Sequence, residues 1–547
     1  MADPAFTRSS AAAPNRRPGL GRMALLLLAA TALAAPALAQ VQVQPLAAPD
    51  LFSTGGGHSD LPPDLWKGSS GALAREVIPE LTSHPVTPAA AVLARHVLGA
   101  GANGPEDAGN DPELAGARAE ALLQLGDITA AQTITAAAAN LPQLPAMSRV
   151  AAEADLISGQ DDKACAVGDS LALGRDGAFW LRLRAYCQAR SNQGPAAQLT
   201  QELADQQEHR PEFDRLMTAM LSGPTPVAAT QPALDDALDF AISRKLGLDW
   251  ASALNGAPAS IAVAVARDPA EPAAARLAAA ARAARLGIAI PEAYAALTPA
   301  PTALPTADMP GPMGEATLVA LADSTNDLTL KESAIIVLLR RAKDGPEFHA
   351  LARLVAPAIA KLMDAKPVLR QPFMFAMAAA AAGDVASAKA ARAQVGQGAA
   401  PPSPADLAIL DALIAAASDP VDPAAVHALE AAAAGAAGEA KARTAGALAL
   451  LGGFAPLDAD ARFAVADADL GAADAPPGRQ LALEQAADQG RIGDVALYVL
   501  ETCVQTGPQG PTPGERALMV RALVKAHLNA DARAFAIEGL VALQARP

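Results

Sequence analysis

Small residues recur every 33 positions between about residues 111 and 221, and this period limits the possible fold more than any other feature of the sequence. Each unit has an alanine, a turn-forming residue seven positions later and a second alanine five positions after that. Alanines at the contact positions let two helices approach closely, and glycine or asparagine ends a helix where the backbone turns left-handed. Three consecutive units keep this spacing: Ala119, Gly126 and Ala131; Ala152, Gly159 and Ala164; Ala185, Asn192 and Ala197.

This spacing resembles that of the tetratricopeptide repeat family, whose unit of about 34 residues is a helix, a turn and a second helix. The resemblance implies an α-solenoid, a right-handed stack of antiparallel helical hairpins. It also implies a curved inner surface that binds peptide segments or other proteins. Two further matches to the spacing lie downstream, one at Ala376, Gly383 and Ala388, and the other at Ala522, Asn529 and Ala534.

The composition favours the same all-α fold. Hydrophobic residues make up 52% of the chain but aromatic residues only 3%, because alanine and leucine supply most of the apolar content. Alanine has the highest helix propensity and a side chain too small to fill a wide core. Alternating β-branched and aromatic runs, which are typical of strands, are nearly absent. A chain of 547 residues can still be built from such thin layers, because a repeat stack grows lengthwise.

The N-terminus has the three parts of a secretory signal peptide. Basic residues precede an apolar run over 23–35, and a small-x-small pattern ends at Ala39. We expect a signal peptide over 1–39, cleavage between Ala39 and Gln40, and a periplasmic or secreted protein exported by the Sec route. The alternative is an uncleaved anchor helix. No later segment has the pattern of a transmembrane helix, because charged residues, glycine or proline interrupt each apolar stretch.

The rest of the chain divides at tracts rich in proline and glycine. A flexible linker is expected over 40–63, tetratricopeptide-like repeats over 64–222, a helical continuation over 231–298, and a C-terminal helical repeat region over 313–547. Five prolines between the last two regions, at 299–312, make that tract the best candidate for a hinge.

Two of the three cysteines are placed to form a disulfide bond. Cys165 and Cys187 are equally distant from a predicted turn at 174–177, so they lie level with each other in a helical hairpin. A bond that closes this loop of about 22 residues would stabilise the fold by roughly 3 kcal/mol. The alternative is a pair of buried free thiols, since no neighbouring ligands complete a zinc site. Cys503 is left either buried or available to link two chains.

Known catalytic and ligand-binding patterns are missing from the sequence. The net charge of -15 without a basic cluster argues against nucleic-acid binding. The seven histidines are scattered and include no pair three or four residues apart, and no phosphate-binding loop or nucleophile elbow occurs. The densest aromatic patch, around Phe179, Trp180 and Tyr186, is either a ligand-binding ridge or core filling. We therefore expect neither a catalytic site nor a metal or cofactor.

The sequence predicts a non-catalytic, exported scaffold that binds an unidentified protein or peptide partner through its repeat surface, with an assembly of the cell envelope as the candidate setting. Fold analogy alone supports this function. One alternative is a degenerate or accessory glycan-processing protein. Soluble lytic transglycosylases also contain helical superhelices, but they need an aromatic-lined cleft around a catalytic glutamate, and this chain has only three Trp and three Tyr. The other alternative is a purely structural spacer.

Overall fold

The computed structural model of the chain describes residues 50–57, 60–222, 230–250, 253–290, 292–293, 301–305, 311–397 and 402–544. These residues form 25 α-helices and no β-strand, apart from one isolated bridge between Ser70 and Glu106. The fold is all-α, as predicted. The predicted signal peptide and its cleavage site, Ala39 and Gln40, lie outside the described residues.

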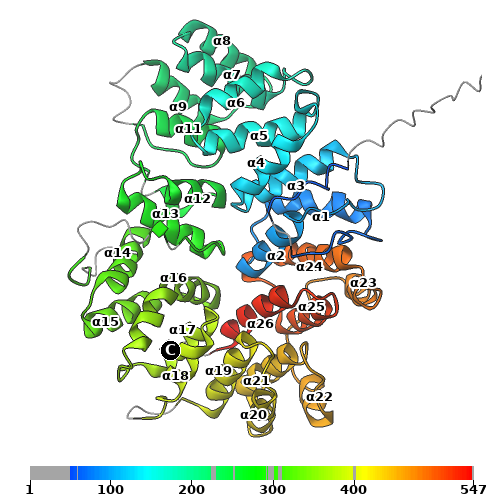
Figure 1. The fold of residues 1–547 in the computed structure, drawn as a ribbon, viewed down its shortest axis with the longest axis vertical. Helices are drawn as coiled ribbons and strands as arrows, with labels where there is room; N and C mark the ends of the chain where they lie inside the picture. Colours follow the sequence, from blue (N-terminus) through cyan, green and yellow to red (C-terminus); the bar gives the residue numbers. More distant parts are fainter. Residues whose placement is uncertain are drawn as a thin grey trace, which may run out of the picture. The chain divides into compact units, whose positions relative to one another are not determined.

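The helices are short and follow one another closely along the chain (Figure 1). None of them, within the part of the chain that the structure describes, combines the length and apolarity needed to cross a bilayer. The first eleven described are α1 Gly71–Ser83, α2 Pro88–Leu98, α3 Pro112–Gln124, α4 Ile128–Ala137, α5 Pro145–Ile157, α6 Asp161–Ser170, α7 Ala178–Arg190, α8 Gly194–Asp205, α9 Pro211–Ser222, α11 Ala237–Lys245 and α12 Ala259–Arg267. The others are α13 Ala273–Arg285, α14 Gly311–Ser324, α15 Leu328–Leu339, α16 Gly345–Asp364, α17 Pro372–Ala381, α18 Val385–Arg392, α19 Pro404–Ala417, α20 Pro423–Ala434, α21 Gly438–Leu451, α22 Ala459–Ala466, α23 Pro477–Asp488, α24 Ile492–Thr506, α25 Pro513–Lys525 and α26 Asn529–Leu543.

The 33-residue period of the sequence is also the period of the helices. Helices α3, α5, α7 and α9 begin at residues 112, 145, 178 and 211, and α4, α6 and α8 begin at 128, 161 and 194. Proline occupies the first position of α3, α5 and α9, where its fixed φ suits a helix and its missing N–H costs nothing. The stretch from 111 to 221 is therefore a run of helix pairs in a single register.

The repeated small residues lie at the contacts between these helices. All six alanines of the three units are fully buried: Ala119, Ala131, Ala152, Ala164, Ala185 and Ala197. The turn residues have left-handed φ values of +86° at Gly126, +74° at Gly159 and +59° at Asn192. In each turn the next residue donates its N–H to the carbonyl five positions back, as Asp127 does to Leu122 at 2.8 Å. This bond closes the end of the first helix.

The same three-residue turn connects α17 to α18, α23 to α24, and α25 to α26. Gly383 and Gly490 occupy its left-handed position in the first two pairs, and His527 does so in the third. The predicted turn at Asn529 is therefore wrong, because Asn529 is the first residue of α26. Histidine is an uncommon residue at positive φ, and the sequence pattern considered only glycine and asparagine.

Part of the predicted flexible linker at 40–63 is packed against the helices. Phe52 is fully buried, and the guanidinium of Arg118 lies 5.0 Å from the centre of its ring. Arg118 donates hydrogen bonds to the carbonyl oxygens of Phe52 at 3.1 Å and Thr54 at 3.0 Å. Residues 50–57 are packed in this way because an arginine from α3 supplies hydrogen-bond donors that the local sequence does not reveal.

The first helices of the described chain pack against the last ones, so the succession of helix contacts closes on itself. Helices α1 and α2 contact α24, and α2 also contacts α26 (Figure 1). The backbone N–H of Ala89 donates to the Glu538 carboxylate at 3.0 Å, and Gly493 donates to the Leu65 carbonyl at 3.1 Å. Repeat stacks need their terminal apolar faces covered. Here each end of the helix series covers the other.

Candidate functional site

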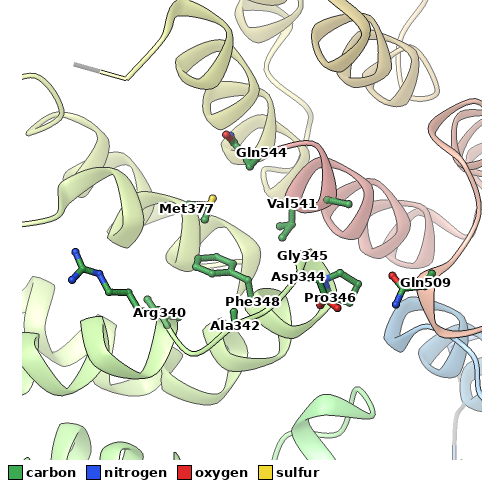
Figure 2. Close-up of a pocket in the computed structure, with 12 residues that line it drawn as sticks. Arg340, Ala342, Asp344, Gly345, Pro346, Phe348, Met377, Gln509, Val541 and Gln544 are labelled. Atoms are coloured by element: carbon green, nitrogen blue, oxygen red, sulfur yellow. The ribbon is translucent and has the colours of Figure 1, made fainter. Parts of the chain in front are cut away.

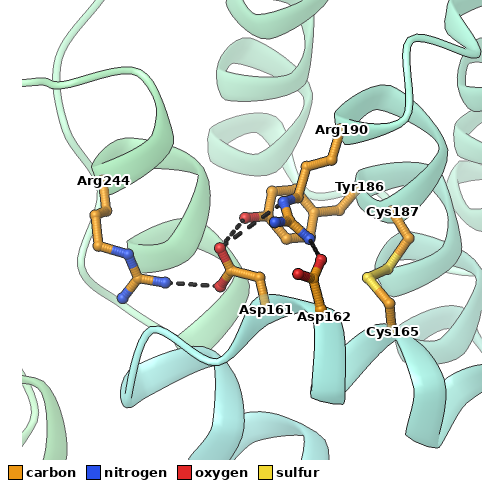
Figure 3. Close-up of a disulfide and its surroundings, with 7 residues drawn as sticks. All are labelled: Asp161, Asp162, Cys165, Tyr186, Cys187, Arg190 and Arg244. Carbon is orange, nitrogen blue, oxygen red and sulfur yellow. Dashed lines mark hydrogen bonds and ion pairs between the residues drawn. A yellow bond between two sulfur atoms is a disulfide. The ribbon is translucent and has the colours of Figure 1, made fainter.

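The disulfide joins two neighbouring repeat units. Cys165 of α6 and Cys187 of α7 are bonded, with a Cα–Cα distance of 5.9 Å, which confirms the predicted pair (Figure 3). The third cysteine, Cys503 of α24, is a buried free thiol, and burial raises its pKa well above the ordinary value. A buried, protonated thiol is a poor nucleophile, so Cys503 does not provide a reactive site.

A polar cluster beside the disulfide connects the repeats to α11. Asp161 accepts hydrogen bonds from the Tyr186 hydroxyl at 3.1 Å and from Arg244 at 2.7 Å, while Arg190 donates to Asp162 at 2.8 Å (Figure 3). Burial, followed by the charge of Asp161, raises the pKa of Tyr186 far above its usual range. These hydrogen bonds link α6, α7 and α11.

An open cavity of about 520 Å³ lies at the N-terminal end of α7, and we call it the α7 pocket. It is formed by parts of α5, the first turns of α7, the segment between α8 and α9, and the residue before α11. Its wall combines apolar groups with three arginines and two carboxylates. The pocket therefore lies where the in-phase repeats meet the next helix of the chain.

The first turn of α7 forms one wall of this pocket. Its N-cap residue, Gly177, has no side chain and makes no capping hydrogen bond. The first backbone N–H groups of any helix lack partners within the helix, and the helix dipole adds partial positive charge there. Gly177, Ala178 and Phe179 all line the cavity. The wall is consequently suited to an anionic or hydrogen-bond-accepting group.

Aromatic and apolar side chains flank this helix end. Trp180 is largely buried and belongs to the core, whereas Phe179 is half-buried on the pocket wall. Their rings make an edge-to-face contact with centroids 5.0 Å apart. The two interpretations of this aromatic patch thus apply to different residues: Trp180 fills the core, and Phe179 is accessible to a ligand.

Arg149 and Arg182 line the pocket from equivalent positions in consecutive units. They are 33 residues apart, and Arg215 follows at the same interval. Sequence reasoning missed this arginine period because only small residues were compared between units. Arg149 lies over the Phe179 ring at 5.1 Å.

Arg182 is only 3% exposed, although it carries a full positive charge. Its guanidinium donates to the Glu208 carboxylate at 3.0 Å and also to the backbone carbonyl of Glu208. Its Nε–H is buried and has no hydrogen-bond partner among the described residues. The buried guanidinium of Arg182 therefore keeps one N–H donor that no described residue accepts.

Two buried carboxyl groups near the pocket have raised pKa values. Burial raises the pKa of Glu153 to about 7, against the opposing effect of its partner Arg149 at 2.8 Å. Burial and the neighbouring Asp236 raise the pKa of Asp239 to about 7, against the effect of Arg210 at 2.7 Å. Burial thus favours the uncharged form of both groups more than water does.

A second cavity, of about 430 Å³, lies between α16, α17 and α26 (Figure 2). Phe348, Met377 and Val541 supply much of its apolar lining, and Gln509 and Gln544 lie at its edges. Asp344, its lining carboxylate, caps α16 by accepting the Glu347 N–H at 2.8 Å. The cavity can accept an apolar side chain, but its lining carboxylate already has a structural function.

The described residues also contain one group of three potential metal ligands, Asp205, His209 and Asp214, whose ligand atoms lie within 4.8 Å of one another. His209 Nδ1 is 3.1 Å from Asp214, and Gln201 donates to the other oxygen of that carboxylate at 2.8 Å. Burial and the charge of Asp214 raise the pKa of Asp205. The sequence search for paired histidines did not detect this group, because two of its three members are aspartates.

A comparison of the chain with models of known protein families, with curated proteins and with solved structures finds no match in any of the three. The fold and the site therefore define the class of the protein by themselves. It is an all-α protein whose helix pairs are compatible with a helical repeat architecture.

Proposed function

We propose that this chain is a non-catalytic, exported scaffold of tetratricopeptide-like repeats that binds a protein or peptide partner in the cell envelope. One observation carries the proposal: an open cavity of about 520 Å³ with both an apolar wall and a charged wall is built by consecutive, in-phase repeat units. Extended chains are recognised by such combinations of backbone-binding groups and side-chain pockets.

The chemistry of the α7 pocket supports binding rather than catalysis. Its lining residues include no serine, cysteine or histidine, and its two carboxylates, Glu208 and Asp236, are paired with arginines. An acid–base pair for glycan cleavage would need a carboxylic acid directed at the substrate beside a free carboxylate. The arrangement favours a scaffold over an accessory glycan-processing protein.

Export is part of the same proposal. The disulfide between Cys165 and Cys187 is of the kind that persists in oxidising compartments such as the bacterial periplasm. Together with the predicted signal peptide, it supports a periplasmic or secreted location. N-terminal sequencing of the mature protein should begin at Gln40. A first residue upstream of the apolar run would indicate an uncleaved anchor.

A site-specific capture experiment tests the binding function. A photo-cross-linking amino acid at Ala178, on the pocket wall, should capture one dominant protein from the native periplasm. The same label at Leu481, which is 68% exposed on α23, provides the control. Equal capture from both positions, or no saturable product, would favour a structural spacer. Release of soluble fragments from peptidoglycan by the purified chain would favour the glycan-processing alternative.

A further inference from the structure

The carboxylate of Glu208, which pairs with the buried guanidinium of Arg182, can be replaced by another carboxylate. Glu208 belongs to the segment between α8 and α9, and its side chain is 62% exposed although it pairs with a side chain that is 3% exposed. A carboxylate that is so exposed can rotate into water with little loss of burial. An arginine prefers a planar carboxylate that accepts two parallel hydrogen bonds. Glu208 therefore occupies a position that another carboxylate can take.

The lining of the pocket becomes more positive when Glu208 leaves. Three arginines line the cavity, Arg149, Arg182 and Arg210, against the carboxylates Glu208 and Asp236. Without Glu208 the lining has three positive groups and one negative group. The uncapped N-terminus of α7 adds partial positive charge on the same wall. Two independent features, the helix end and the buried Arg182 with its unpartnered Nε–H, thus favour an anion.

The apolar wall favours a particular source of that anion. The pocket beside the helix end is lined by Phe179, Trp180 and Pro145. A ligand whose carboxylate binds at the helix end would therefore place its neighbouring group against apolar side chains. A C-terminal residue with a large apolar side chain presents both groups on one carbon. Capture of a terminal carboxylate by backbone N–H groups is an established mode of peptide recognition.

We infer that the α7 pocket binds the free C-terminal carboxylate of a partner peptide that ends in a large apolar residue, and that Glu208 occupies the carboxylate position until the partner displaces it. The incoming carboxylate pairs with Arg182 and accepts from the first N–H groups of α7. Its side chain lies against Phe179. This inference rests on the proposed function and specifies the chemistry of the ligand.

Fluorescence polarisation with defined peptides tests the inference on the full mature chain. The probe is a fluorescein-labelled Ala-Ala-Ala-Ala-Phe peptide with a free C-terminus. Its comparison peptides are the C-terminal amide and an amidated peptide with an internal glutamate. Only the free acid should bind saturably. Equal binding by the amide would overturn the inference, and stronger binding by the internal glutamate would assign the site to acidic side chains instead.

Two variants give opposite expected effects. Glu208→Gln removes the competing charge and should tighten binding of the free acid about fivefold. Arg182→Lys keeps a positive charge but loses the planar pair of donors, and should weaken binding at least about tenfold. Glu202→Gln, an exposed residue of α8 outside the pocket lining, should leave binding unchanged.

The Glu208→Gln variant tests the inference even if Arg182→Lys fails to fold. Unchanged or weaker binding of the free acid by Glu208→Gln would refute the competition between Glu208 and the peptide carboxylate. If this variant binds none of the peptides, the pocket is not a carboxylate-binding site. Capture at Ala178 tests the proposed function separately. A captured partner without carboxylate-dependent peptide binding would preserve the scaffold function and eliminate only the ligand class.

Discussion

Replacing Glu538 with glutamine tests whether the contact between the first and last helices is a major source of stability. Glu538 of α26 and Arg516 of α25 are 1% and 4% exposed, and their charged groups are 2.6 Å apart. The other oxygen of Glu538 accepts the Ala89 N–H of α2 at 3.0 Å. One carboxylate thus neutralises a buried arginine and binds the backbone of a helix 449 residues earlier.

The expected loss is large because glutamine keeps the shape of the side chain but not its charge. Burial alone disfavours the ionised form of Glu538, yet Arg516 and the other partners hold its pKa below the ordinary value, so the native state contains a charged pair. Removing one member of a buried pair typically destabilises a protein by about 3–5 kcal/mol, because the other charge is left uncompensated. In addition, the glutamine amide can offer an acceptor to only one of its two partners.

Urea unfolding of the mature chain, followed by circular dichroism, measures this loss. Asp411→Asn is the matched control, because Asp411 and Arg392 form a two-bonded pair at 2.7 and 2.9 Å whose side chains are about 30% exposed. The control should cost below about 1 kcal/mol. Hydrogen exchange in Glu538→Gln should accelerate first in α1 and α2. Equal losses in the two variants, or acceleration elsewhere, would refute the importance of this helix contact.

Three further predictions concern the repeats. Replacing both Cys165 and Cys187 with alanine should lower the unfolding free energy by about 3 kcal/mol, because the disulfide closes a loop of 22 residues. Urea unfolding of this variant and of the oxidised chain measures the difference. An unchanged unfolding free energy would show that the disulfide does not stabilise the fold. Because burial raises the pKa of Glu153 to about 7, the folded state binds its proton more tightly than the unfolded state, so stability should fall from about pH 4.5 to 7. Glu153→Gln should reduce that slope, and an unchanged slope would contradict the assignment. Gly126→Ala should lower the melting temperature more than Gly383→Ala. Both glycines have positive φ, but only at Gly126 would an added Cβ meet a side-chain carbon at 2.5 Å. Equal decreases in melting temperature would show that the backbone conformation alone causes the loss of stability.

The helix pairing explains the composition of the core in the part of the chain that the structure describes. Consecutive short helices make contact through alanine and leucine, and the few large aromatic residues fill particular gaps, as Trp66 and Trp180 do. Stability is then distributed over many neighbouring contacts. The α7 pocket forms where this regular packing reaches α11.

The local structure of the repeats follows from the order of the amino acids alone. A period of 33 residues in alanine and turn formers was sufficient to predict helix pairs, because close helix contact and left-handed turns impose residue types at fixed distances along the chain. The same local reasoning predicted the bond between Cys165 and Cys187, which lie on either side of one turn. It failed at His527, because the pattern compared only glycine and asparagine at the left-handed position of the turn.

The contact between the two ends of the helix series and the position of the charged pocket depend on long-range packing. Ala89 and Glu538 have no local signal that links them, and the carboxylate of Glu538 can accept from any correctly placed N–H. Arg182 and Glu208 are likewise ordinary residues of a helix and a loop until folding buries one beside the other. A charged side chain acquires its partner, its burial and its pKa from neighbours in space, and those neighbours are distant or irregular in the sequence.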